Sequence, residues 1–491
     1  MINKPQHLIK STLLVSSLLL LSACSIKSQF IGSENEPHKR LDSGISNELS
    51  IQRDDINLPE QWASKLKELK TTSKWLQNFH DPLLIEIIDK ALTNNFKLKQ
   101  QALAVDIKKH QLLNAGSQFW PNVTANLSVN RRKTGNISNS TSLDLTAKYE
   151  LDLWGKLSAN EQKANLDWLS QQSNFEQQKN QLIVSTLTAW YNAVATEKLL
   201  QLNIQRAKNT KQNLAIIESG YKEGLNSALD VYLTRNELNS ALAKVTEFNN
   251  SALKSKRIVE NLIGDYPRAN ILLASKLPKI NSSPILGIPA DILQKKPSLQ
   301  ASWYQLLATD ASLAFAHKQR FPSFSFSASI NDQQTNLSDL FSPSSLGWSL
   351  LGNISAPLFQ AGRLRNNEKI ARLVLRQQEQ NYLDTLYQSF SDVENAISKG
   401  ASLQQQMLFQ SDAGENAQSA YKLSFEQYQQ GLVNYSTVLD AQNRWFDAQS
   451  SVIQLQNELL ANRANLNLAL GGDFTFTTQV SEKNSSKMVM K

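Results

Sequence analysis

The sequence predicts a mainly α-helical chain with membrane β-strands, built from two structural repeats that each hold two strands and a pair of long helices. Three glycines recur 207 residues later, and the matched pairs are Gly155 with Gly362, Gly224 with Gly431, and Gly264 with Gly471. The 39 residues between Gly224 and Gly264 contain neither Gly nor Pro, as long helices require. Four other segments alternate apolar and polar residues, which is typical of strands.

The N-terminus has the pattern of a secretory signal. Lys4 and Lys10 precede an apolar run from Leu13 to Leu21, and Ser22-Ala23 then leads into Cys24, the one cysteine of the chain. This arrangement resembles a bacterial lipoprotein signal, which implies cleavage of residues 1–23 and lipidation of Cys24. Ser25 after it implies sorting to the outer membrane. The alternative is an ordinary signal peptide with a chance cysteine. Loss of the two lysines leaves a mature charge of 8 − 2 = +6.

Composition and motifs argue against several functions. The positive charge is dispersed, which disfavours nucleic acid as a partner. Beyond the signal, no run of about 18 apolar residues could form a membrane-spanning helix. The five histidines are scattered, a second cysteine is absent and there is no Gly-rich phosphate loop. The sequence therefore predicts no enzyme, no catalytic or metal site, and no cofactor apart from the lipid on Cys24.

The first repeat is expected over residues 71–264, after a linker or wrapping segment at 24–70. Asp81 is the expected N-cap of its first helix, with Pro82 at the first helical position. Two strands are expected at about 120–132 and 141–153, because Val123 to Val129 and Leu143 to Leu153 alternate with polar residues. A polar loop should join these two strands into a hairpin.

The second repeat is expected over residues 291–472, after an irregular connection at 265–290, and a polar tail follows at 473–491. Its strands should lie at about 322–331 and 346–356, where Phe324 to Ile330 and Leu346 to Ala356 alternate. Such lengths suffice to cross a bilayer, although a soluble sandwich would show the same alternation. Four strands cannot close a barrel, so strands in lipid would require an oligomer.

Long helices should follow each strand pair. Lys156 to Ser219 contains 64 residues without Gly or Pro, about 96 Å as one helix. The expected return helix runs from Leu225 to Ile263. The second copy runs from Arg363 to Gln430 and back from Leu432 to Leu470. Their narrow apolar stripes predict lateral pairing, as in coiled coils.

The segment from Tyr149 to Lys156 reads YELDLWGK and resembles the signature of NodT-type outer-membrane efflux lipoproteins, within the TolC-like outer membrane factor family. Further segments are similar to motifs of that family; they are Trp75 to Leu83, Ala91 to Asn95, Ala361 to Leu364 and Phe390 to Ala396. The resemblance covers roughly residues 70–472. One departure is Lys296-Pro297-Ser298, where relatives usually carry Arg-Pro-Asp, and a local change in helix capping is expected there.

The resemblance implies a homotrimer whose strands form a 12-stranded barrel in the outer membrane, above a periplasmic α-helical tunnel. The implied function is the exit duct of a tripartite efflux system, which passively conducts substrates delivered by an inner-membrane pump through a periplasmic adaptor (membrane fusion) protein. Outer-membrane lipid is a further implied partner. Two alternatives stay open: the outer-membrane duct of type I protein secretion, and a structural or adhesive lipoprotein.

The helix reversals at Gly224 and Gly431 are the expected periplasmic gate. Relatives often place acids six and nine positions after this glycine, facing the pore, and here Thr437 and Asp440 occupy those positions. In the first copy the sixth position is Asp230. Rings of acid at a constriction favour cations. The alternative is that each acid merely stabilises the start of a helix.

Tyr428 matches a family position that helps to hold the entrance shut, although packing between helices would explain it equally well. Val433 stands where the family carries a basic partner, so the closing contact must differ here. The two copies also differ from each other: Asp230 aligns with Thr437, and Leu233 aligns with Asp440. We therefore expect the gate where the repeats diverge.

Overall fold

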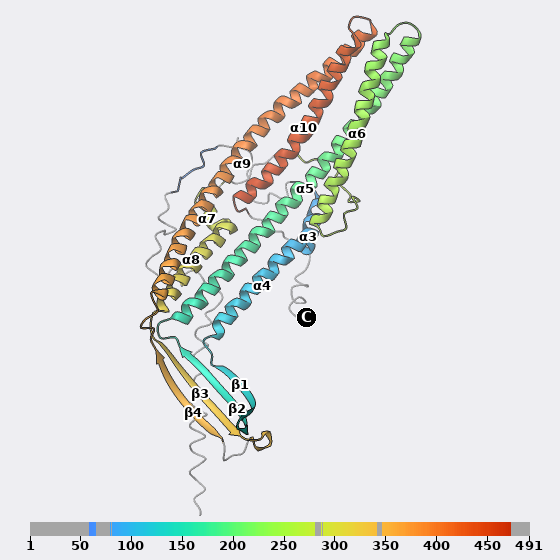
Figure 1. Cartoon of the computed structure of the whole chain (residues 1–491). Coiled ribbons are helices and arrows are strands. Elements are labelled where there is room, and N and C mark those ends of the chain that lie inside the picture. Colours follow the sequence, from blue (N-terminus) through green and yellow to red (C-terminus); the bar gives the residue numbers. More distant parts are fainter. Residues whose placement is uncertain are drawn as a thin grey trace, which may run out of the picture. The chain divides into compact units, whose positions relative to one another are not determined.

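The structure is a computed structural model that describes residues 58–64, 79, 81–279, 286, 288–340 and 346–472 (Figure 1). All the described residues belong to one compact unit of the chain. The signal peptide at 1–23, Cys24 and the tail at 473–491 lie outside the described residues, as does most of the linker at 24–70.

Eight α-helices are described. They are α3 (Pro82–Asn94), α4 (Phe96–Ser117), α5 (Lys156–Lys222), α6 (Ala228–Leu262), α7 (Asp291–Lys295), α8 (Pro297–Lys318), α9 (Arg363–Gln429) and α10 (Tyr435–Ala469). A short 3-10 helix, η4, covers Leu337–Asp339. Within the parts of the chain that the structure describes, none of the helices is long and apolar enough to cross a membrane. The prediction of a mainly helical chain with two halves is confirmed.

The two halves repeat each other in detail. Helices α5 and α9 both have 67 residues, and α6 and α10 both have 35. Each long helix ends in a left-handed glycine, Gly224 with φ 76° or Gly431 with φ 74°. The amide of the next residue reaches back to a carbonyl of the last turn, from Leu225 to Gly220 at 2.8 Å and from Leu432 to Gln427 at 2.9 Å. Glycine adopts this backbone conformation without the steric cost of a Cβ, so both helices reverse in the same way.

The strands form one antiparallel sheet in the order β1-β2-β3-β4, with bounds β1 Asn122–Thr134, β2 Asn136–Leu151, β3 Ser323–Gln334 and β4 Gly347–Ser355. The prediction of a polar loop between the first two strands is wrong. Instead β1 and β2 pair up to Thr134 and Asn136, around a turn at Gly135 with φ 88°. Cross-strand hydrogen bonds hold this polar stretch in the sheet despite its low β-propensity.

Helix α5 is the central helix, and it contacts α3, α4, α6, α8 and α10 (Figure 1). The largest apolar cluster surrounds its middle, where Trp190 and Tyr191 are fully buried. The Trp190 indole N–H donates to the Asp81 carboxylate at 2.9 Å, and the other oxygen of Asp81 accepts from the Leu84 amide at 3.2 Å. Asp81 is thus the N-cap of α3, and Pro82 is the first residue of the helix, as predicted.

Lys296 separates α7 from α8 at the departure from the family pattern. It is the N-cap of α8 but makes no capping hydrogen bond with its side chain. Its buried ammonium lies 3.4 Å from the Asp392 carboxylate on α9. Burial lowers the pKa of Lys296, against the opposing effect of Asp392. The side chain therefore ties α8 to α9.

Candidate functional site

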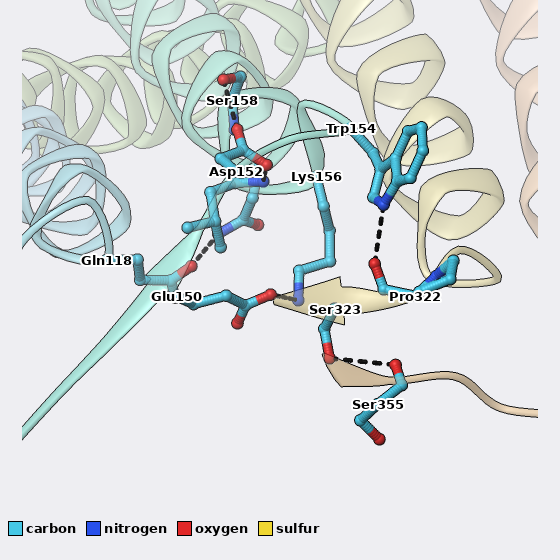
Figure 2. Close-up of polar contacts among 11 residues, drawn as sticks. Gln118, Glu150, Asp152, Trp154, Lys156, Ser158, Pro322, Ser323 and Ser355 are labelled. Atoms are coloured by element: carbon cyan, nitrogen blue, oxygen red, sulfur yellow. Dashed lines mark hydrogen bonds and ion pairs between the residues drawn. The ribbon is translucent and has the colours of Figure 1, made fainter. Parts of the chain in front are cut away.

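The YELDLWGK segment forms the joint between the sheet and α5 (Figure 2). Asp152 accepts hydrogen bonds from the Leu157 amide at 2.9 Å, the Ser158 amide at 2.9 Å and the Ser158 hydroxyl at 2.7 Å. The N-cap residue itself is Gly155, which has no side chain with which to cap the helix. Asp152 therefore satisfies the free amides at the start of α5 from outside the helix.

The same joint connects the two repeats. The Trp154 indole N–H donates to the Pro322 carbonyl at 2.7 Å, and its ring lies 5.4 Å from that of Phe321. Lys318 at the end of α8 donates to the Gly155 carbonyl at 3.2 Å. Lys156 also forms an ion pair with Glu150 on β2. The motif thus holds the start of α5, which follows β2 in the first repeat, against the start of β3, which follows α8 in the second repeat.

We expect Asp152→Ala to lower the stability of the folded chain by about 1 kcal/mol at neutral pH, because it uncaps α5. Burial opposes ionisation of Asp152, but the hydrogen bonds from Ser158 and Leu157 outweigh it and lower its pKa below 3.8. Its stabilisation is therefore complete above about pH 4 and is lost as the pH falls through the lower folded-state pKa. Thermal unfolding at a series of pH values measures this.

Asp152→Asn is the matched variant, since it keeps one carbonyl acceptor and should cost less than the alanine. A stability difference between wild type and Asp152→Ala that does not shrink in acid would contradict the capping role.

At the other end of the long helices, Tyr428 on α9 reaches across to the first repeat. Its hydroxyl donates to Asn226 Oδ1 at 3.1 Å, and Asn226 Nδ2 donates to the Ile217 carbonyl at 3.1 Å. The Tyr428 ring lies 5.1 Å from that of Tyr435, which is fully buried. Burial raises the pKa of Tyr435 to about 12. We call Asn226, Asp230, Tyr428 and Tyr435 the reversal cluster.

Asp230 has a structural role at the start of α6. Its carboxylate accepts from the Ser227 amide at 3.3 Å, while its own amide donates to Ser227 Oγ at 3.2 Å. This reciprocal capping box is the helix-start role that the sequence left open as the alternative. Burial raises the pKa of Tyr428, and the charge of Asp230 raises it further. Tyr428 is thus hydrogen-bonded to Asn226, four residues before Asp230 in the chain.

Asp440 lies on the exposed surface of α10, with its side chain 65% exposed. Its carboxylate accepts from Arg444 Nε at 2.9 Å, one helical turn further on, and this hydrogen bond raises the pKa of Arg444. Thr437 is also exposed, and its amide donates to the Asn434 carbonyl at 3.0 Å in the first turn of α10. Asp440 therefore carries a basic companion that the sequence analysis did not consider.

Sequence reasoning missed the partner of Tyr428. Asn226 aligns with Val433 across the 207-residue repeat, so the polar group that is absent after Gly431 is present after Gly224. The caps differ in the same way: Ser227 caps α6 with its side chain, but the aligned Asn434 makes no such bond to α10. Comparing the two copies position by position could have revealed Asn226.

Sequence reasoning also missed a second contact between the two helical hairpins, α5–α6 of the first repeat and α9–α10 of the second. Arg206 on α5 donates to Glu237 Oε1 on α6 at 2.9 Å and to Asn443 Oδ1 on α10, and it lies 3.7 Å from Asp447 Oδ1. Its guanidinium also lies 5.7 Å from the centre of the Phe446 ring. We call Arg206, Glu237, Asn443 and Asp447 the Arg206 clasp. No local pattern marked this arginine among the many basic residues of α5.

The model of the family described as "Outer membrane efflux protein" matches residues 87–265 and 288–472, so it covers both repeats. The solvent efflux pump outer membrane protein SrpC of Pseudomonas putida is 28% identical over 411 residues, 81% of this chain and 87% of that protein. The probable outer membrane lipoprotein SilC of Salmonella typhimurium is 26% identical over 411 residues, with the same shares covered.

Solved structures have the same fold. The CmeC outer membrane channel of Campylobacter jejuni matches with a TM-score of 0.78 at 20% identity, over 88% of this chain and 97% of that one. CusC, whose structures concern transmembrane channel formation, matches with a TM-score of 0.75 at 23% identity, over 87% of this chain and 100% of that one. Among the described residues, no group of His, Cys, Asp and Glu is arranged to hold a metal ion.

Proposed function

Because the chain belongs to the outer membrane efflux protein family, we propose that it forms the exit duct of a tripartite efflux system. It is an outer-membrane channel rather than an enzyme, and it passively conducts what an inner-membrane pump delivers through a periplasmic adaptor. The observation that carries this is the family match over both repeats, which includes the sheet and both helix reversals. Relatives named for solvent efflux favour small molecules over the protein cargo of type I secretion.

The sheet supports a homotrimer. Among the described residues it has four strands, and both β1 and β4 are its edges. Its apolar face is exposed, with Val123 at 62%, Leu127 at 58% and Trp348 at 80%. Open edges are not tolerated in hydrocarbon, so other copies must cover them if the apolar face lies in lipid. Three copies would pair β1 with a neighbouring β4 and close a 12-stranded barrel.

The helix reversals support docking of the adaptor. Leu225 is 77% exposed and Leu432 is 68% exposed, each next to its left-handed glycine. Such apolar side chains on two turns give a partner protein separate contact points at the end remote from the sheet. Cys24 lies outside the described residues, and we propose that it carries diacylglycerol and an N-acyl chain; the mass of the mature N-terminal peptide tests this.

Conductance across a planar bilayer tests the duct. The purified full chain should open discrete channels, and unheated samples should migrate as a trimer on gels while boiled samples migrate as monomers. A structural or adhesive lipoprotein would form no channel. Channels from a protein that migrates as a monomer without heating would instead contradict the trimer.

We propose that the reversals form the periplasmic gate, with Asp440, Asp230 and Thr437 facing the pore and Tyr428 holding it shut through Asn226. A trimer would place three carboxylates at each acidic position. Asp440→Asn is expected to lower the cation-to-anion permeability ratio, because it also leaves the charge of Arg444 without its partner. Reversal potentials in asymmetric salt measure the ratio.

The matched control is Asp106→Asn, which removes an exposed acid from α4, away from the reversals. It should leave the permeability ratio unchanged. An unchanged ratio in Asp440→Asn would retire the assignment of Asp440 to the pore.

A further inference from the structure

The hairpin between β1 and β2 carries a concentrated positive charge. Arg131, Arg132 and Lys133 are consecutive at the end of β1, and all three are exposed. Residues 122–143 contain no Asp or Glu, and the acids of the hairpin, Asp144 and Glu150, lie farther along β2 toward the helices. In the part of the chain that the structure describes, none of the three side chains forms a salt bridge. The proposed function gives this charge no role.

The strand pattern divides the three bases between the faces of the sheet. Side chains alternate along a strand, so Arg131 and Lys133 share a face with Val123, Leu127 and Val129, whereas Arg132 lies on the other face. The register supports this division, since Leu127 pairs with Leu143 and Arg132 pairs with Ser138. One face therefore passes from apolar to basic within two residues, from Val129 to Arg131.

The apolar face continues across the other strands. Its exposed members are Leu145 on β2, Phe326 and Ile330 on β3, and Trp348, Leu350 and Ile354 on β4. The helices join this sheet at one end, and the turn at Gly135 lies at the opposite end of β1 (Figure 1). Lys133 lies four residues beyond Val129, about 13 Å along the strand. That distance spans the transition from hydrocarbon to headgroups.

We propose that Arg131 and Lys133 bind phosphate groups on lipids of the outer leaflet. The inference rests on the proposed function, which places the helices in the periplasm and hence this hairpin at the far leaflet. In bacterial outer membranes that leaflet contains phosphate-bearing glycolipid. Guanidinium and ammonium groups both bind phosphate, and long basic side chains at the edge of an apolar band extend to the headgroups.

Comparison with the β3–β4 connection indicates that the proposed lipid site belongs to the β1–β2 hairpin alone. Residues 335–346, between β3 and β4, include Asp339 but no Lys or Arg, and the end of β3 carries a further acid, Asp332. A trimer would therefore carry three lipid sites, one for each copy. The competing occupant is Asp339 of a neighbouring copy, because pairing of β1 with a neighbouring β4 would bring that loop close.

The test uses the full-length protein in phosphatidylcholine vesicles with lipid A that carries its phosphates, or with lipid A stripped of them. Native mass spectrometry of the extracted protein measures the bound lipid. The double variant Arg131→Gln with Lys133→Gln should weaken binding of phosphorylated lipid A by roughly 25-fold, about fivefold for each charge removed. Binding of the stripped lipid should not change.

Two further variants sharpen the test. Arg132→Gln removes the same charge from the opposite face, so it should keep lipid binding but shift the ion selectivity of the channel. Exchange of the two bases, Arg131→Lys with Lys133→Arg, should retain binding.

Equal binding by the double variant and the wild type would overturn the proposal, and so would an equal loss in Arg132→Gln. Loss of the heat-resistant trimer in the double variant, with lipid binding retained, would assign the bases to the neighbour's Asp339 instead. If a variant gives any of these results but still forms normal channels, the proposed duct function stands. A wild-type protein that forms no channel would contradict the duct itself.

Discussion

Arg206→Ala is expected to lower the free energy of unfolding by about 3 kcal/mol and to increase the conductance of the channel. The Arg206 side chain is 10% exposed and that of Glu237 is 17% exposed, so the alanine leaves a largely buried carboxylate without its cation. It also removes the contacts to Asn443 and Asp447, which join the first hairpin to α10. Thermal unfolding and single-channel recording measure the two effects.

Polar packing around the Arg206 clasp makes it an important tie between the hairpins. Between the clasp and Tyr435, the described buried atoms Thr210 Oγ1 and both polar atoms of the Gln442 amide have no hydrogen-bond partner within the chain. Buried polar groups without partners weaken an interface. The clasp supplies the polar contacts that these groups of α5 and α10 do not make, and separation of the two helices would widen the entrance.

Arg235→Ala is the matched control. Arg235 pairs with Glu218 at 2.7 Å and also joins α6 to α5, but the two side chains are 54% and 36% exposed. An exposed pair of this kind contributes less than about 1 kcal/mol. Similar losses of stability in the two variants would contradict the special role of Arg206. Lost stability with unchanged conductance would limit the clasp to a structural role.

Trp190→Ala is expected to lower the free energy of unfolding by about 3–5 kcal/mol, the largest stability effect that we predict. The Trp190 side chain is fully buried in the main apolar cluster, so its removal leaves a cavity where α3 packs on α5. It also removes the indole donor that holds the N-cap Asp81. The midpoint of thermal unfolding measures the change.

Trp190→Phe separates the two contributions. It retains an aromatic ring and loses the hydrogen bond to Asp81, so a cost of about 1–2 kcal/mol is expected. Equal costs for Phe and Ala would assign the effect to the hydrogen bond rather than to packing. A cost for Ala below about 1 kcal/mol would contradict the placement of Trp190 in the core.

Local signals predicted the parts of the fold that depend on neighbouring residues. Asp81 followed by Pro82 specifies a helix start through the backbone conformations that these residues favour. The long helices were predicted because Gly and Pro are absent from most of their length. The hairpin of the first two strands was predicted, but its tight turn at Gly135 was not, because Asn136 to Ser140 favours a loop by itself and forms a strand only when its backbone pairs with β1.

The candidate site was partly predictable for the same reason. Asp230 was selected from its spacing to Gly224 and Tyr428 from the family resemblance, and the structure shows Asp230 in the capping box of α6 and Tyr428 bound to Asn226. Asn226 accepts the hydrogen bond of Tyr428 from a position 202 residues away, and no local pattern encodes such a contact. The pore-facing roles of Asp440 and Thr437 stay predictions.

The sequence by itself determined the repeated framework: two pairs of long helices, two reversals and four alternating strands. These follow from glycine spacing, Gly and Pro avoidance and side-chain period, which act over a few residues at a time. Only the tertiary structure decided which hairpins are tied together, through Arg206 and through Tyr428 with Asn226. Such contacts depend on side chains that meet after the helices have packed, so burial and the arrangement of charges across helices decide them.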